Sequence, residues 1–454
     1  MTGTTLERPS LGGRIRQYRD AGLAVSRWTF VTLRRGVLPS GLNGLRVLVR
    51  EGRSDLHWKV LGDSLASVLE DAGPLATKVG QILATRTDLI PEALGARLEV
   101  LFERQRPMTR TQLRRALDAA YGGAPPFELE EKPLGVGSVG QVHRAKLAGG
   151  ERVVVKVLRP GVAAAIERDL RAAHALLPLV VPLAGGDRTA ARRLLDRALD
   201  DLAAGFRRET DLLAEADSLV EFRERLQRNP RVVVPLCHRA LCRPGVLVME
   251  QLEGESLASF RRRAREDPDA ARRVAALAFK EILQQVFEDG RFHADPHAGN
   301  LLVLPDGRLG ILDLGLTGEL GPGQRAAITQ AIRAFLARDP GRVVRALLGL
   351  GAAPPDFQVE AFEREVVLAV SSIAPGPDRL ERLVNDLLAV ARRHEIEIPR
   401  ATTHLVKALV TIEGVARSLD PDLDLARAAL PVILTALRPR WLDKLAFWRP
   451  RRGP

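Results

Sequence analysis

The feature that most constrains this chain is a run of apolar, mostly β-branched residues with a lysine in its middle. The run, Arg152–Leu158, is bounded by Gly149-Gly150 and Pro160-Gly161, and glycine and proline at both ends are typical of a β-strand. An ammonium group inside an apolar strand is costly unless it meets a partner. The run therefore predicts either an edge strand with a solvated Lys156 or a strand whose lysine binds an acidic or phosphate group.

A glycine-rich segment precedes this strand by about twenty residues and fits the pattern G-x-G-x-x-G-x-V. Its pattern residues are Gly135, Gly137, Gly140 and Val142, with Ser138 inside the loop. Glycines let backbone N–H groups approach phosphates because no Cβ stands in the way. Taken alone, the segment is a weak signal and fits a tight turn better, in which the glycines only satisfy positive φ angles. The dinucleotide-binding version of the motif should open a helix, whereas a strand pattern follows here.

The segment His293–Asn300 places an aspartate and an asparagine five residues apart, at Asp295 and Asn300. This is the catalytic-loop spacing of kinases, in which the carboxylate lies near the phosphoryl acceptor and the amide oxygen binds a metal. His293 and His297 could instead form a zinc-binding pair at helical spacing. Pro296 between them argues against the helix that such a pair needs.

Asp313-Leu314-Gly315 follows a short predicted hairpin around Asp306-Gly307, and it matches the kinase D-F-G element with leucine in place of phenylalanine. Asp313 is the expected Mg²⁺ ligand, together with Asn300. The strand lysine would contact the α and β phosphates of ATP. Met249, Glu250 and Leu252, at the end of the last early strand and in the linker after it, are expected to contact the nucleotide.

The elements predicted along the chain fall into three parts. Residues 1–120 are mostly helical, with Leu61–Arg86 at helical spacing and a further helix opened by Pro91. Residues 121–250 carry strands and two long helical segments at 162–178 and 189–227. Residues 251–454 contain another helix at 269–289, the hairpin, and a helix bundle at 323–437. The pattern predicts an α+β, bilobal protein-kinase-like fold with an N-terminal helical extension and a helix-rich C-lobe.

These motifs resemble the UbiB/AarF family of atypical kinases, which is associated with ubiquinone and other isoprenoid-lipid metabolism. The resemblance covers about residues 60–425. The similarity includes an element that ordinary protein kinases lack, the KxGQ motif, matched here by Lys78-Val79-Gly80-Gln81. The ExD motif is matched by Glu209-Thr210-Asp211, and a late signature by Glu413–Pro421.

The resemblance implies roles for these residues. Glu215 would pair with Lys156, and Asp295 would act as a base or position a water molecule. The helix that carries Lys78 and Gln81 would cover the active-site mouth, with Lys78 reaching Glu209 or Asp211. Such a cover disfavours a protein substrate and favours ATP hydrolysis or a small or lipid-like acceptor.

Three differences from the family are visible in the sequence. Family members usually carry an alanine-rich loop where this chain has its three glycines, and Ala298 replaces a proline of the family's H-A-D-P-H-P-G-N pattern. Members from ubiquinone-making bacteria often end in membrane-spanning helices, whereas no run here approaches the ~18 apolar residues of a span. The protein is therefore expected in the cytoplasm, without a signal peptide.

The net charge of +12 is concentrated at the two ends. Residues 1–50 hold nine arginines, and the tail from Arg438 interleaves basic residues with Trp441, Phe447 and Trp448. This combination suits peripheral attachment to an anionic membrane surface, although an arginine-rich composition explains it equally well. No nucleic-acid-binding module is present in the sequence. Cys237 and Cys242 have the spacing of ordinary, partly buried thiols rather than of a disulfide framework or zinc site.

The sequence therefore predicts an atypical kinase or ATPase that uses ATP and Mg²⁺ and supports quinone or isoprenoid-lipid metabolism at the membrane surface. Two alternatives stay open. One is a small-molecule phosphotransferase of the aminoglycoside-kinase type, and the other is a non-catalytic, ATP-responsive scaffold that binds lipid or a partner. The sequence names neither the phosphoryl acceptor nor the oligomeric state.

Overall fold

The structure is a computed structural model that describes residues 69, 74–84, 92–98, 106–181, 188–263, 266–337, 339–350, 354, 357–371, 379–396 and 398–437. The basic first fifty residues and the tail from Arg438 lie outside the described residues, as does the part after Leu98 of the helix predicted from Pro91 to about Arg104. The chain divides into two compact units. The first takes the described residues up to Ala216 together with Cys237–Gln251, and the second takes Asp217–Leu236 and the described residues from Leu252 onward.

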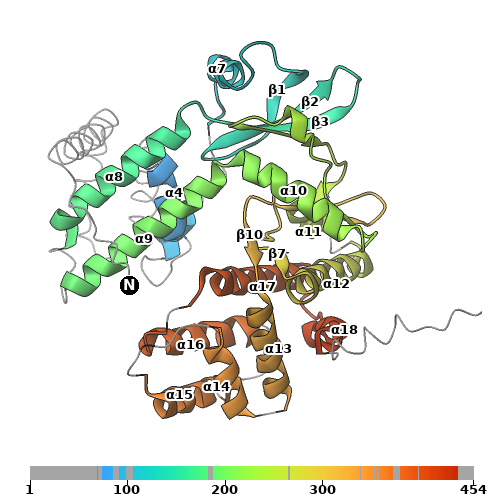
Figure 1. Cartoon of the computed structure of the whole chain (residues 1–454). Coiled ribbons are helices and arrows are strands. Elements are labelled where there is room, and N and C mark those ends of the chain that lie inside the picture. The colour runs from blue at the N-terminus through green and yellow to red at the C-terminus, as the bar shows by residue number, and fades with distance from the viewer. Residues whose placement is uncertain are drawn as a thin grey trace, which may run out of the picture. The chain divides into compact units, whose positions relative to one another are not determined.

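The first unit contains a four-stranded antiparallel sheet in the order β1-β2-β3-β5 (Figure 1). The strands are β1 (Phe127–Val136), β2 (Gly140–Leu147), β3 (Arg152–Leu158) and β5 (Val246–Glu250). The four valines of β3 are all buried, as expected for a strand that has neighbours on both sides. The predicted strand at 152–158 is confirmed, and it is not an edge strand.

The same unit also contains helices, of which α7 packs on β3 (Figure 1). They are α4 (Pro74–Ala84), α5 (Glu92–Leu98), α7 (Arg110–Tyr121), α8 (Val162–Val180) and α9 (Arg188–Glu209). The long helices α8 and α9 pack against each other, and α4 packs on α8. One buried cluster joins α4, the glycine-rich loop and these two helices through Leu75, Val139, Val162, Ile166, Leu170, Ala203 and Phe206.

The helical segment predicted at 189–227 is two helices, so that prediction is wrong in one respect. Helix α9 ends at Glu209, and α10 runs from Leu212 to Leu226. Asp211 caps the second helix, because its Oδ1 accepts the N–H of Ala214 at 3.0 Å. The Thr210 hydroxyl donates to the Phe206 carbonyl at 2.8 Å. These two polar side chains compete with the helical backbone bonds and end α9.

Two cysteines flank a single 3₁₀ turn, Arg239–Leu241, in the first unit. Both are free thiols, as predicted from their spacing, but they are buried rather than partly buried. Their Sγ atoms lie 3.8 Å apart. A hydrogen bond from Cys237 is the largest of the effects that lower the pKa of Cys242 to about 7.

The second unit contains two small sheets, one ordered β4-β9-β8-β6 and one made of β7 and β10. The strands are β4 (Val232–Val233), β6 (Glu255–Ser256), β7 (Arg291–His293), β8 (Leu301–Val303), β9 (Leu309–Ile311) and β10 (Thr317–Glu319). The predicted hairpin is confirmed as β8–β9, and its turn uses Gly307 at a φ of 80°. Both hairpin strands are buried, so they hold the residues that flank them in fixed positions.

The rest of the second unit is helical, as predicted (Figure 1). The helices are α11 (Leu257–Arg263), α12 (Pro268–Gln284), α13 (Pro322–Leu336), α14 (Pro340–Leu348), α15 (Val359–Ser371), α16 (Arg379–Arg393), α17 (Arg400–Leu419) and α18 (Leu425–Leu437). A π-helical turn, Gln285–Asp289, follows α12 and leads into β7. Helix α17 packs on α12. Within the described part of the chain, no helix is both long and apolar enough to cross a membrane.

Candidate nucleotide and magnesium site

Lys156 is held by a carboxylate on the first turn of α10. Its Nζ lies 2.8 Å from Oε2 of Glu215 and 3.0 Å from Oε1. Only 19% of the lysine side chain and 3% of the glutamate side chain are exposed. The predicted pairing is therefore confirmed, and the solvated edge lysine is wrong because β2 and β5 flank β3. Removing either partner would leave the other charge buried and uncompensated.

The glycine-rich loop is the turn between β1 and β2. None of Gly135, Gly137 and Gly140 has a positive φ, so the interpretation that these glycines only satisfy positive φ angles in a tight turn is wrong. A Cβ at Gly135 would meet nothing within 4 Å, and one at Gly137 would lie 3.6 Å from the nearest carbonyl oxygen. A Cβ at Gly140 would lie 2.5 Å from the carbonyl oxygen of Val157 on β3. Gly140 is thus required by strand packing, whereas the other two glycines have room for a methyl group.

Apolar packing and hydrogen bonds within the first unit hold the middle of this loop in place. Val139 is buried in the helix cluster, and its carbonyl accepts the N–H of Arg159 at 2.8 Å. The Arg159 guanidinium donates to the Gly137 carbonyl at 3.2 Å. The Gly137 N–H donates to the Gly140 carbonyl at 2.8 Å and so is already engaged. Ser138 lies at the tip, and Val142 pairs with Lys156 across the β2–β3 ladder.

Matched alanine substitutions should separate the packing role of the loop from a phosphate role. We expect Gly140→Ala to lower the free energy of unfolding by about 1–3 kcal/mol, because its methyl group overpacks against the β3 backbone. Gly137→Ala should change stability by about 1 kcal/mol or less while slowing ATP turnover or altering ADP-versus-ATP preference. Urea unfolding and nucleotide kinetics on both variants provide the measurement. Equal destabilisation by the two substitutions would contradict the packing argument.

The KxGQ helix α4 is tied to the end of α9 within the first unit. Lys78 Nζ lies 2.6 Å from Oε1 of Glu209, and each side chain is about one-third exposed (33% and 34%). The ion pair predicted for Lys78 is therefore confirmed, with Glu209 rather than Asp211 as the partner. Asp211 instead caps α10, the helix that carries Glu215. Gln81 lies in α4, and its side chain is outside the described residues.

A double-mutant cycle should measure the coupling free energy of the Lys78–Glu209 ion pair. Lys78→Ala and Glu209→Ala are expected to show a coupling of about 0.5–1 kcal/mol, the range for a partly exposed ion pair. The more exposed pair between Arg207 on α9 and Glu167 on α8 offers a matched control, and its coupling should be smaller. Unfolding in urea at low and high salt provides the free energies. Strictly additive effects for the Lys78–Glu209 cycle would show that α4 is held by apolar packing alone.

The segment predicted to contact the nucleotide through Met249, Glu250 and Leu252 begins on β5. Met249 is buried and pairs with Val154, and Glu250 ends the strand opposite Val153. Leu252 belongs to the second unit. The contact of these three residues with a nucleotide stays a prediction.

The Asp295–Asn300 loop closes on itself through short-range hydrogen bonds in the second unit. The His297 N–H donates to the Asp295 carbonyl at 2.8 Å, and the Asn300 N–H donates to the His297 carbonyl at 2.9 Å. Asn300 Nδ2 also donates to the Asp295 carbonyl at 3.2 Å, which directs the amide oxygen away from it. The ring of His297 accepts the Gly299 N–H at 3.1 Å. The fixed spacing of Asp295 and Asn300 thus follows from the geometry of one small loop.

Sequence reasoning missed one residue at this loop, Lys407 on α17. Its Nζ lies 2.9 Å from Oδ2 of Asp295, and the two side chains are 48% and 31% exposed. No local spacing relates the two residues, because the pair forms only when α17 packs near the catalytic loop. The family signature Glu413–Pro421 on and after the same helix was the signal that α17 matters, although it did not single out Lys407.

Asp313 lies two residues after the end of β9, and its Oδ1 accepts the N–H of Gly315 at 2.9 Å. Leu314, at the position of the usual phenylalanine, is 1% exposed and anchors this turn in the core. The Leu312 N–H donates to the Asn300 carbonyl at 2.9 Å, which links the metal-ligand candidates Asn300 and Asp313 through the backbone. A carboxylate and an amide oxygen are the donor types that Mg²⁺ prefers. The two residues therefore suit a magnesium ion.

A buried polar network supports β7, which leads into the catalytic loop. The His293 N–H donates to Gln285 Oε1 at 3.0 Å, and Gln285 Nε2 donates to Glu281 at 3.2 Å. Glu281 is fully buried and is bound by Arg228 and Asn229. Desolvation nevertheless raises the pKa of the Glu281 carboxyl. Burial lowers the pKa of His293 to about 4, so its ring is neutral at pH 7 and serves as a packed core group.

These two half-sites define a kinase-like protein. One carries a strand lysine held by a helix glutamate, and the other carries an Asp-x₄-Asn loop followed by Asp-Leu-Gly. Residues 100–347 match the ABC1 atypical kinase-like domain, and residues 379–424 match the UbiB helical domain. The chain belongs to the UbiB family of ABC1 atypical kinase-like proteins. The α+β kinase-like fold predicted from the sequence is confirmed.

Relatives and a solved structure agree with this family. The chain is 34% identical to a protein of Azotobacter vinelandii named "Probable protein kinase UbiB", over 84% of this chain and 72% of that protein. It is 33% identical to a protein of the same name from Marinobacter nauticus, over 84% and 70% of the two chains. A Mycobacterium tuberculosis protein solved in complex with erythromycin has a similar fold, with a TM-score of 0.55. That similarity covers 90% of this chain and 99% of the other at 21% identity.

Proposed function

We propose that this protein binds Mg²⁺-ATP and cleaves its γ-phosphate, as an ATPase or as a kinase for a small or lipid-like acceptor. The observation that carries the proposal is the ion pair between Lys156 and Glu215, 2.8 Å long and largely buried. An apolar residue in the middle of β3 would fill a purely structural role without the desolvation cost of a buried ion pair. A lysine oriented by a glutamate is the arrangement that receives the α and β phosphates in kinases.

The residues present fit each task that phosphoryl transfer requires. Lys156 would bind the α and β phosphates, and Asn300 and Asp313 would hold Mg²⁺. The ion, when bound, neutralises charge that develops on the phosphate oxygens. Asp295 would accept a hydrogen bond from the attacking hydroxyl group or water molecule, and Lys407 would hold that carboxylate in one orientation. Hydrolysis converts ATP and water into ADP and phosphate.

The class of phosphoryl acceptor is inferred from the position of the KxGQ helix α4 and from the family to which the chain belongs. The Lys78–Glu209 pair holds α4 at the end of α9, and an ordered helix there supports an acceptor smaller than a folded protein. Together with the family's association with isoprenoid lipids, this supports a role in quinone or related lipid metabolism at a membrane surface. The basic ends of the chain would supply attachment to anionic lipid.

Multiple-turnover phosphate release tests the function directly. ATP turnover should require Mg²⁺ and Lys156, and it should rise in the presence of phosphatidylglycerol vesicles with a quinone-like phenol. The matched control is Lys146→Met, which removes an exposed lysine from the neighbouring strand β2. Nucleotide binding without phosphate release would replace the proposal with an ATP-responsive scaffold. Transfer of phosphate to a soluble aminoglycoside-like molecule would favour the small-molecule phosphotransferase instead.

A further inference from the structure

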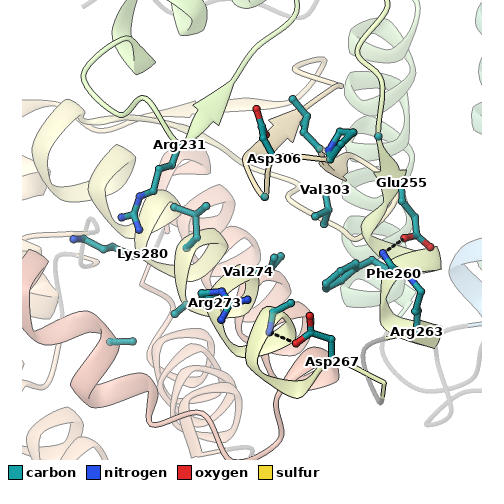
Figure 2. A pocket seen from close by; sticks show the side chains of 18 of the residues that line it. Arg231, Glu255, Phe260, Arg263, Asp267, Arg273, Val274, Lys280, Val303 and Asp306 are labelled. Atoms are coloured by element: carbon teal, nitrogen blue, oxygen red, sulfur yellow. Dashed lines mark hydrogen bonds and ion pairs between the residues drawn. The ribbon is translucent and has the colours of Figure 1, made fainter.

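A separate cavity of about 950 Å³ lies wholly within the second unit (Figure 2). Its walls come from α11, α12, α18, the turn of the β8–β9 hairpin and the residue before β4. None of the residues assigned to nucleotide or magnesium lines it. The volume is in the range of sites that hold small organic ligands.

One face of α12 supplies both apolar and cationic side chains to the cavity. Ala270, Arg273, Val274, Leu277 and Lys280 recur at helical spacing and all line it. Val274 and Leu277 are buried, whereas Arg273 is exposed and Lys280 is half-buried. The same face of the helix therefore presents apolar side chains and two cations to one space.

The positive charge of the cavity is only partly neutralised by the protein. Its acidic residues already have partners: Glu255 binds Arg263 at 3.0 Å, Asp267 caps α12 at the Ala270 N–H, and Asp306 binds Arg308 at 2.7 Å. Four lining cations make no ion pair with any residue that the structure describes, namely Arg231, Arg273, Lys280 and Arg427. In Figure 2, Arg231 and Lys280 lie on one side of the cavity, and Phe260 lies across from them.

Cations gathered in a recess attract an anion, because the low-dielectric walls focus their field. The apolar part of the lining is formed by Phe260, Val274, Leu277, Val303, Leu304 and Pro431. It would exclude water and favour a hydrocarbon body next to the anionic group. We propose that this cavity binds a single anionic amphiphile, with a phosphate or carboxylate head among the four cations and an apolar body against α11 and the hairpin.

Isothermal titration with octyl phosphate below its critical micelle concentration tests the proposal on the whole chain without nucleotide. Octyl phosphate should bind at least tenfold more tightly than inorganic phosphate, since each buried methylene adds up to about fourfold in affinity. Octyltrimethylammonium, with the same chain and the opposite charge, should not bind. Equal affinity for octyl phosphate and inorganic phosphate would overturn the apolar half of the site, and binding of the cation would overturn the anionic half.

Three variants localise the binding. Arg273→Glu with Lys280→Glu should weaken octyl phosphate at least tenfold, whereas Lys132→Glu with Lys146→Glu makes the same change in net charge on the first unit and should have no effect. Ala270→Phe fills the cavity without altering charge and should also weaken binding at least tenfold. Circular dichroism confirms that each variant is folded.

Unchanged affinity in the Ala270→Phe variant, or equal losses in the two charge-reversal variants, would overturn the assignment to this cavity. Binding to phosphatidylglycerol vesicles without binding to monomeric octyl phosphate would overturn it as well, since the source would then be a membrane surface. Because no nucleotide is present, failure here leaves the proposed ATP chemistry untouched.

Discussion

Replacing Asp313 by asparagine is expected to abolish stabilisation by Mg²⁺-ATP while leaving the fold intact. The amide is nearly isosteric, and its oxygen can still accept the Gly315 N–H that Asp313 accepts at 2.9 Å. It lacks the negative charge that a divalent ion needs from its ligands. A thermal shift with Mg²⁺-ATP measures the difference. At a ligand concentration of 100 times Kd, the wild-type protein should gain about 2.7 kcal/mol and the variant close to none.

Asp306→Asn is the matched control, because Asp306 is an exposed carboxylate in the nearby hairpin turn. Its response to Mg²⁺-ATP should equal that of the wild-type protein. Titration with ATP in the presence of a chelator should show a reduced shift for both proteins that retain Asp313. An undiminished Mg²⁺-dependent shift in Asp313→Asn would exclude this residue as the metal ligand.

Replacing Lys407 by methionine should lower kcat for ATP turnover by about 100-fold, at the low end of the contribution of a positioned general base. Methionine keeps much of the side-chain length but removes the ammonium group that lies 2.9 Å from Asp295. The carboxylate would then lose its fixed orientation toward the attacking group. KM for ATP should change less than about threefold, since Lys407 is assigned to the catalytic carboxylate rather than to the nucleotide.

Two further variants test whether Lys407 acts by orienting the Asp295 carboxylate. Lys407→Arg restores a cation and should recover part of kcat, whereas Arg400→Met removes an exposed cation from the same helix and should have no effect. Turnover at saturating ATP provides kcat, and urea unfolding shows whether any variant is destabilised. A kcat for Lys407→Met equal to that of the wild-type protein would make the ion pair incidental.

The local parts of the site could be predicted because short stretches of sequence determine them. The strand around Lys156 follows from β-branched residues between glycine and proline punctuation. The Asp295–Asn300 loop and the β8–β9 hairpin follow from spacing and turn residues within a few positions. The need for a partner at Lys156 also follows from the sequence, since a charge inside an apolar strand must be compensated.

Other features depended on contacts between segments far apart in the chain. The structure decided that Lys78 pairs with Glu209, that Asp211 is used to cap α10, and that Lys407 meets Asp295. It also showed that Gly140 is required by the carbonyl oxygen of Val157 on the neighbouring strand. Spacing along one chain segment cannot specify such pairs, because each depends on how whole helices and strands pack. The family motifs identified most of these residues, and only the tertiary structure decided which atoms they bind.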